Sequence, residues 1–100
     1  MSITIIGEFE ISHDPANEPA LVIHHLIRGY DAVQLDAATT TELADLLTVQ
    51  QKRIRELGGY RVLFGAGGDV VFYAPNGQRA CYFVPDQAAH LMRVLTEPVS

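Results

Sequence analysis

Adjacent histidines at positions 24 and 25 are the first candidates for chemistry, because imidazole nitrogens bind metal ions and titrate near neutral pH. His13 and Asp14 could add further ligands. Neighbouring residues on a β-strand point to opposite faces, so His24 and His25 cannot hold the same ion. We therefore predict no metal site. His24 is expected to be a hydrogen-bonded core residue beneath a helix, and His25 to lie on an outer sheet face, where it could make association pH-dependent.

Three other combinations could support catalysis or phosphate binding. Cys81 and His90 could form a nucleophile and its base, but the cysteine is expected to be buried and no third group orients the histidine. The glycine-rich segment 65–69 precedes a predicted strand, whereas a phosphate loop needs a helix N-terminus. Glu8 and Glu10 share one face of a predicted strand as solvated charges. The sequence therefore predicts a protein that is not an enzyme, with no catalytic, cofactor-binding or metal-binding residues.

A shift of 48 residues aligns segment 22–47 with segment 70–95 without a gap. The identities fall on a turn glycine, a strand and a helical stripe: Val22 with Val70, Gly29 with Gly77, Ala32 with Ala80, Leu43 with Leu91, and Leu47 with Leu95. Such agreement favours an internal duplication. We predict one domain over residues 1–100, in which two pseudo-repeat halves, roughly 1–58 and 59–100, fold as the same unit.

The second half shows this unit most clearly. Segments 69–74 and 79–84 flank Asn76–Gly77, a dipeptide typical of two-residue hairpin turns. The turn predicts the inner pairs Val70–Phe83, Phe72–Cys81 and Ala74–Arg79, and the outer pairs Val71–Tyr82 and Tyr73–Ala80. Pro85 suits the first position of a helix.

The first half repeats the pattern with a looser turn at Arg28–Gly29. This turn would pair Val22 with Leu35 and His24 with Val33, leaving Ile23 and His25 on the outer face.

A helix over 37–57 follows, with Asp36 as its N-cap and Thr39 with Glu42 as an alternative capping box. Gly58–Gly59 would end this helix. Further strands at 3–11 and 60–64 precede the two hairpins. The order βββα–βββα predicts an α+β fold with an antiparallel sheet, whole or in two halves, and both helices packed on one face.

Two surfaces suggest binding. The outer sheet face would expose a set of mainly apolar side chains suited to a homodimer or a docked partner: Ile23, His25, Ile27, Val71, Tyr73 and Tyr82. Strong coiling of the sheet, which would bury part of this face, is the alternative. Residues 1–50 also hold eight acidic residues and one basic residue, whereas residues 51–100 hold four acidic and six basic residues. The expected partner-binding acidic residues are Glu8, Glu10, Asp14, Glu18 and Asp31.

These features favour a small acidic, non-enzymatic protein-binding module. We expect a regulator or inhibitor of a larger protein complex, for example one that handles nucleic acids, of the kind that phages and mobile elements encode, such as anti-CRISPR-type proteins. Its partner would present a basic surface. The single cysteine and the lack of a signal peptide or an apolar span indicate a cytoplasmic location without membrane contact. A small enzyme or ligand-binding domain with its site at a dimer interface remains an alternative.

The βββα–βββα order is similar in outline to PUR-repeat and Whirly-type domains, although those repeats have one more strand. This resemblance implies binding of single-stranded nucleic acid. Tyr73 and Tyr82, with Arg61 and Arg79 nearby, could then stack and neutralise a strand. The net charge of −5 opposes phosphate binding, so nucleic acid is the second hypothesis.

Overall fold

The chain repeats one unit of four antiparallel strands and a helix. The structure, a computed structural model, describes residues 2–49 and 51–97. The elements of the first half are β1 (Ser2–Ile6), β2 (Phe9–His13), β3 (Leu21–His25), β4 (Tyr30–Leu35) and α1 (Ala37–Leu47). Those of the second half are β5 (Arg53–Leu57), β6 (Tyr60–Phe64), β7 (Val70–Tyr73), β8 (Arg79–Phe83) and α2 (Pro85–Thr96).

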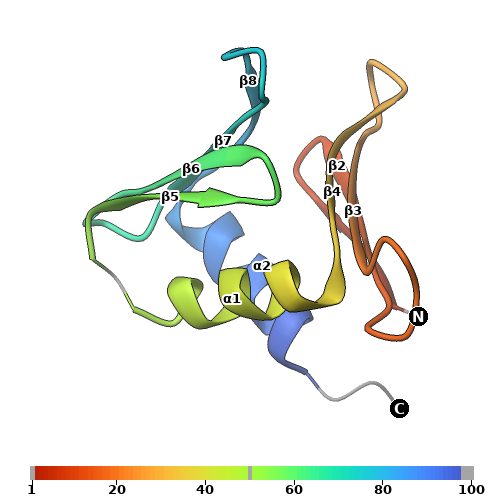
Figure 1. Ribbon diagram of the computed structural model, residues 1–100, viewed down its shortest axis with the longest axis horizontal. Coiled ribbons are helices and arrows are strands. Elements are labelled where there is room, and N and C mark those ends of the chain that lie inside the picture. The colour runs from red at the N-terminus through yellow and green to blue at the C-terminus, as the bar shows by residue number, and fades with distance from the viewer. Residues whose placement is uncertain (1, 50, 98–100) are drawn as a thin grey trace.

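Each set of four strands forms its own meander, with the orders β1-β2-β3-β4 and β5-β6-β7-β8. We call them the N-terminal sheet and the C-terminal sheet. The two sheets are inclined to each other, and both helices lie together on the side where the sheets spread apart (Figure 1). The predicted α+β class is confirmed. The predicted βββα unit is wrong by one strand, because each repeat is ββββα.

The missing strands have two local causes. Segment 3–11, predicted as one strand, folds back at Gly7, whose φ of 61° suits a tight turn between β1 and β2. The predicted helix over 37–57 ends at Leu47, and Arg53–Leu57 forms strand β5 instead. Gly58–Gly59 is therefore a hairpin turn rather than a helix end, with positive φ at both residues. The halves consequently meet between Leu47 and Arg53, earlier than predicted.

Register was predicted correctly in one hairpin and wrongly in the other. Val70–Phe83, Phe72–Cys81 and Val71–Tyr82 pair as expected, although a bulge places Tyr73 opposite Arg79. In the first half, the loop over 26–29 is longer than the predicted two-residue turn.

This longer loop pairs Leu21 with Leu35 and Ile23 with Val33. A change of one residue turns every side chain of a strand to the other face. Ile23 is therefore fully buried, and His24 lies on the outer face opposite Asp31.

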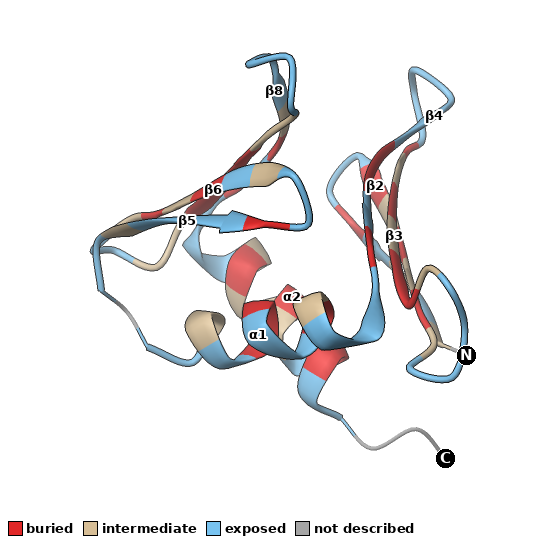
Figure 2. Ribbon diagram, viewed as in Figure 1, coloured by how far each residue is buried: buried red, intermediate tan, exposed pale blue. Residues whose placement is uncertain are grey.

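The core lies between the inner sheet faces and the two helices (Figure 2). Its largest side chains, all less than 2% exposed, include Phe72, Phe83, Ile11, Leu21, Ile23, Leu35, Leu43 and Leu91. Helix α1 begins where the Asp36 carboxylate accepts a hydrogen bond from Thr39 N at 2.7 Å. Hydrogen bonding with the side chain and then with the backbone of Thr39 lowers the pKa of Asp36. Pro85 occupies the first turn of α2, as predicted.

The halves also exchange contacts. A Cβ atom on Gly7, in the β1–β2 turn, would meet Gln87 Nε2 in α2 at 2.8 Å. A Cβ atom on Gly58, in the β5–β6 turn, would meet Leu35 Cδ2 at 3.0 Å and Thr39 Cγ2, in α1, at 3.6 Å. The first hairpin of each half therefore packs on the first turn of the helix of the other half. Tyr60 adds a link, because its hydroxyl accepts a hydrogen bond from Gln34 N at 3.3 Å.

Candidate binding surfaces

The outer face of the C-terminal sheet has an apolar row across all four strands. Pairing places Ile54 beside Leu63, Leu63 beside Val71 and Val71 beside Tyr82. Ile54 is 59% exposed and Tyr82 39% exposed, and the two residues between them are half-buried. Where one face of an antiparallel sheet is exposed to water, the side chains on that face are normally polar. An apolar row on the outer face is therefore unusual.

A second row on the same face is charged and aromatic. It runs from Glu56 through Arg61 and Tyr73 to Arg79. Arg61 Nη2 donates to Glu56 Oε1 at 3.4 Å, an exposed ion pair. A concavity of about 570 Å³ opens on this face, lined by residues of both rows and of the adjoining turns: Ile54, Glu56, Gly59, Arg61, Leu63, Tyr73, Ala74, Pro75 and Gly77.

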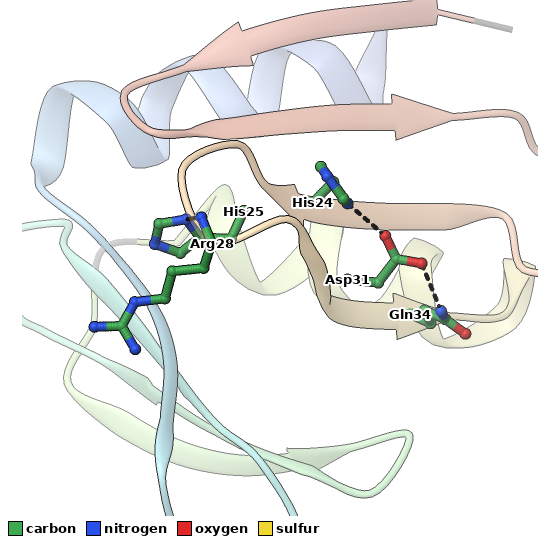
Figure 3. Close-up of polar contacts among 5 residues, drawn as sticks. All are labelled: His24, His25, Arg28, Asp31 and Gln34. Atoms are coloured by element: carbon green, nitrogen blue, oxygen red, sulfur yellow. Dashed lines mark hydrogen bonds and ion pairs between the residues drawn. The ribbon is translucent and has the colours of Figure 1, made fainter.

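The outer face of the N-terminal sheet has a different character. Its equivalent rows are Ile3–Ser12–Val22–Gln34 and Ile5–Glu10–His24–Asp31. His24 Nδ1 donates to Asp31 Oδ1 at 2.8 Å, and Gln34 Nε2 donates to Asp31 Oδ2 at 3.0 Å (Figure 3). These hydrogen bonds tie the polar side chains to one another. This face therefore combines the exposed side chains of Ile3 and Ile5 with polar side chains, of which His24, Asp31 and Gln34 are paired with one another.

The predicted docking residues divide between these locations. Val71, Tyr73 and Tyr82 lie together on the outer face of the C-terminal sheet. The prediction was wrong for Ile23 and His25, which point inward because of the register of β3. Ile27 is 73% exposed but lies in the β3–β4 loop of the first half, not on a strand of that face.

The predicted acidic residues do not form one surface. Glu10 and Asp31 flank His24 on the outer face of the N-terminal sheet. Glu8 lies in the β1–β2 turn, whereas Asp14 and Glu18 lie in the β2–β3 loop at the opposite end of β2.

The groups considered for catalysis, metal binding or phosphate binding are mostly buried or form a turn. Cys81 is 3% exposed, and its burial raises the pKa of the thiol. His13 is 5% exposed, and desolvation lowers the pKa of its imidazole. Residues 65–69 form the turn before β7, closed by Gly65 N donating to Asp69 O at 2.9 Å. Within residues 2–49 and 51–97, no three metal-ligating side chains gather.

The sequence patterns did not predict that Ile54 and Leu63 lie on the surface. Ile54 falls within the helix predicted over 37–57, so that prediction does not place it on a strand beside Leu63 of β6. The usable signal was the Gly58–Gly59 pair, which joins two five-residue strands as a hairpin dipeptide would.

Comparisons with protein-family models, with curated proteins and with solved structures found no match. In the part of the chain that the structure describes, neither helix has the length and apolar character needed to cross a bilayer.

Proposed function

We propose that the protein is a non-enzymatic protein-binding module that uses the outer face of the C-terminal sheet. The supporting observation is the row Ile54–Leu63–Val71–Tyr82, which places apolar side chains of four adjacent strands side by side in water. Covering such a row removes apolar area from solvent, at about 25 cal/mol per Å². Exposed aromatic side chains beside arginines are also typical of interface centres.

A second copy of the chain is the first partner in this proposal. Two copies can pack face to face about a two-fold axis parallel to the strands, so that β5 of one faces β8 of the other. That arrangement sets Glu56 against Arg79 of the second copy, and Arg61 against Tyr73. Ile54 then meets Tyr82, and Leu63 meets Val71. Both rows are thus complementary to themselves.

The outer face of the N-terminal sheet stays uncovered in this dimer. Its carboxylates, Glu10 and Asp31, would meet a basic surface of a larger protein complex, which the dimer regulates or inhibits. A cytoplasmic location belongs to the same proposal. The regulated process and any phage origin are expectations from composition alone.

Single-stranded nucleic acid is the second candidate ligand of the same face. The fourth strand in each half removes the difference in strand number from PUR-repeat and Whirly-type domains. Arg61, Tyr73 and Arg79 also lie in one row, with Tyr82 in the next. Aromatic stacking beside arginine is the chemistry that binds unpaired bases. The excess of acidic residues elsewhere in the chain ranks this candidate second.

Ile54→Asp, with Ile3→Asp as its matched control, tests the face. Both isoleucines lie on the first strand of their sheet, and they are 59% and 57% exposed. We expect light scattering to give a dimer for the wild type and for Ile3→Asp, and a monomer for Ile54→Asp. Dimers of both variants, or a monomeric wild type, would contradict the proposed dimer.

Titration with a single-stranded oligonucleotide separates the second candidate. Near physiological ionic strength, the protein-binding proposal predicts no binding. Micromolar binding that weakens steeply with salt and is reduced in Arg61→Gln would favour nucleic acid instead.

A further inference from the structure

A second concavity lies between the two halves, and Tyr82 of the apolar row is part of its lining. It has a volume of about 460 Å³, within the range of small-ligand sites. Its lining comes from the β1–β2 turn, the β3–β4 loop and the first residues of β4 on one side, and from β8 on the other. We call it the inter-sheet cleft. Both halves of the chain are therefore needed to form it.

Aromatic rings make the N-terminal side of the cleft rigid. Phe9 lies 5.4 Å from Phe83 and 5.0 Å from His25, and His25 stacks on Tyr30 at 5.8 Å between ring centroids. His25 Nδ1 accepts a hydrogen bond from Arg28 N at 3.2 Å. This bond fixes the β3–β4 loop against the ring stack. Arg28 and Tyr30 are thus held on a defined support.

Two guanidinium groups reach the cleft from opposite sides. Arg28 extends from the β3–β4 loop toward the strands of the C-terminal sheet (Figure 3). Arg79 lines the cleft from β8. The ion pairs among the described residues are His24–Asp31, His25–Glu8 and Arg61–Glu56, so neither arginine has a carboxylate within 4.0 Å. Two like charges in one cleft repel each other unless an anion lies between them.

The remaining polar group of the cleft, Glu8, indicates that the ligand has another polar group besides an anion. Glu8 Oε2 lies 3.7 Å from His25 Nε2, and the glutamate is mostly exposed to the cleft mouth. A carboxylate there repels an anion but accepts a hydrogen bond from a hydroxyl or amino group. Tyr30 and Tyr82, 45% and 39% exposed, offer ring faces on the two sides. The lining therefore fits a ligand with an anionic end, a hydrogen-bond donor and a planar ring.

We propose that the inter-sheet cleft binds a nucleoside 5′-phosphate group. Arginine forks match phosphate oxygens in two-point hydrogen bonds, and tyrosine faces stack on bases. Arg28 and Arg79 hold the phosphate, Tyr30 and Tyr82 contact the base, and Glu8 accepts from a sugar hydroxyl. The group can belong to a free nucleotide or to the 5′ end of a strand. Arg79 and Tyr82 also belong to the face proposed for the dimer, whereas Glu8, Arg28 and Tyr30 do not.

Calorimetric titration with adenosine, cytidine, guanosine and uridine 5′-monophosphates tests the site. We expect at least one to bind with submillimolar affinity, and Arg28→Gln to weaken it about tenfold or more. Arg28→Gln keeps the backbone N–H that bonds His25, so the loop should stay in place. Arg55→Gln, an exposed arginine on β5 outside the cleft, is the control and should bind as the wild type does.

Two further probes define the ligand. The matching nucleoside without phosphate should bind at least about tenfold more weakly, as should inorganic phosphate without a base. A 5′-phosphorylated oligonucleotide that binds more tightly than the mononucleotide, and loses this in Arg28→Gln, would assign the group to a strand end.

The proposal is overturned if no nucleotide binds at millimolar concentration, or if Arg28→Gln binds as the wild type does. Arg28 lines the cleft but not the apolar row, and Ile54 belongs to the row but not to the cleft, so Arg28→Gln reports on the cleft and Ile54→Asp on the dimer. Loss of one property with retention of the other would show which proposal fails.

Discussion

The outer faces of the two sheets have the same framework and different chemistry. Ile3–Ser12–Val22–Gln34 on the N-terminal sheet corresponds, strand by strand, to Ile54–Leu63–Val71–Tyr82 on the C-terminal sheet. The rows share isoleucine and valine and differ at two positions. Ser12 and Gln34 are polar where Leu63 and Tyr82 are apolar. Both sheets also have a register shift at the same place, between Ile23 and His24 and between Phe72 and Tyr73.

The inner faces differ much less. Ile11 corresponds to Val62, Leu21 to Val70 and Ile23 to Phe72, and all six side chains are buried. The core requires apolar side chains at these positions, whereas the outer face is free to change. The packing of the core therefore explains why the inner residues of both halves are apolar. The apolar outer row of the C-terminal sheet has no such structural explanation, which is why we assign it to binding.

The largest expected effect separates the inner face from the outer face. Ile23→Ala should lower the free energy of unfolding by about 2–5 kcal/mol, because the side chain is fully buried. Ile54→Ala removes the same atoms from an exposed position and should cost less than about 0.5 kcal/mol. Urea denaturation of both variants measures the difference. Equal costs would mean that Ile23 is not in the core.

The next effect tests the exchange of contacts between halves. Gly58→Ala should destabilise the protein by about 1–3 kcal/mol, because a positive φ strains alanine and its Cβ meets Leu35. Gly29→Ala has the same kind of strain, but no atom lies within 4 Å of its Cβ. In thermal unfolding, the melting temperature of Gly58→Ala should therefore be lower than that of Gly29→Ala. A higher melting temperature for Gly58→Ala would contradict the packing of the β5–β6 turn on the first half.

A smaller effect concerns a pair of inner positions at which one half has a titratable side chain and the other does not. His13 corresponds to Phe64, and desolvation lowers the pKa of His13 below its ordinary value of 6.5. The unfolded chain thus binds a proton more readily than the folded chain does. Stability should be fully present above pH 6.5 and should decline as the pH falls below it.

His13→Phe should flatten this decline relative to the wild type, as measured by urea midpoints between pH 7.5 and pH 5. An unchanged pH dependence would assign the decline to other groups.

The duplication was readable from the sequence, but its register was not. The offset between equivalent residues is 51 in β2, where Phe9 corresponds to Tyr60, and 49 in β3, where Ile23 corresponds to Phe72. It becomes 48 from β4 onward, where Leu35 corresponds to Phe83. A gapless shift of 48 therefore aligned the last strand and the helix correctly. It assigned His24 to the position of Phe72, because the loops of the two halves differ in length.

Strand β5 shows why the fourth strand was missed. Ile54 and Leu57 continue the helical spacing of the leucines in α1, and five residues are too few to show alternation clearly. Only the pairing with β6 shows that residues 53–57 form a strand rather than a helix. This pairing turns Ile54 outward and Leu57 inward. The inter-sheet cleft was equally unpredictable. Arg28 and Arg79 are far apart in sequence, and only the packing of the two halves brings them to one cleft.

Leu63→Ser combined with Tyr82→Gln tests the central claim most directly. The double variant gives the C-terminal sheet the same outer row as the N-terminal sheet, while every core residue is retained. We predict that light scattering shows a monomer where the wild type is a dimer, with nearly unchanged urea denaturation. A double variant that unfolds like the wild type and still forms the dimer would contradict the assignment of this face.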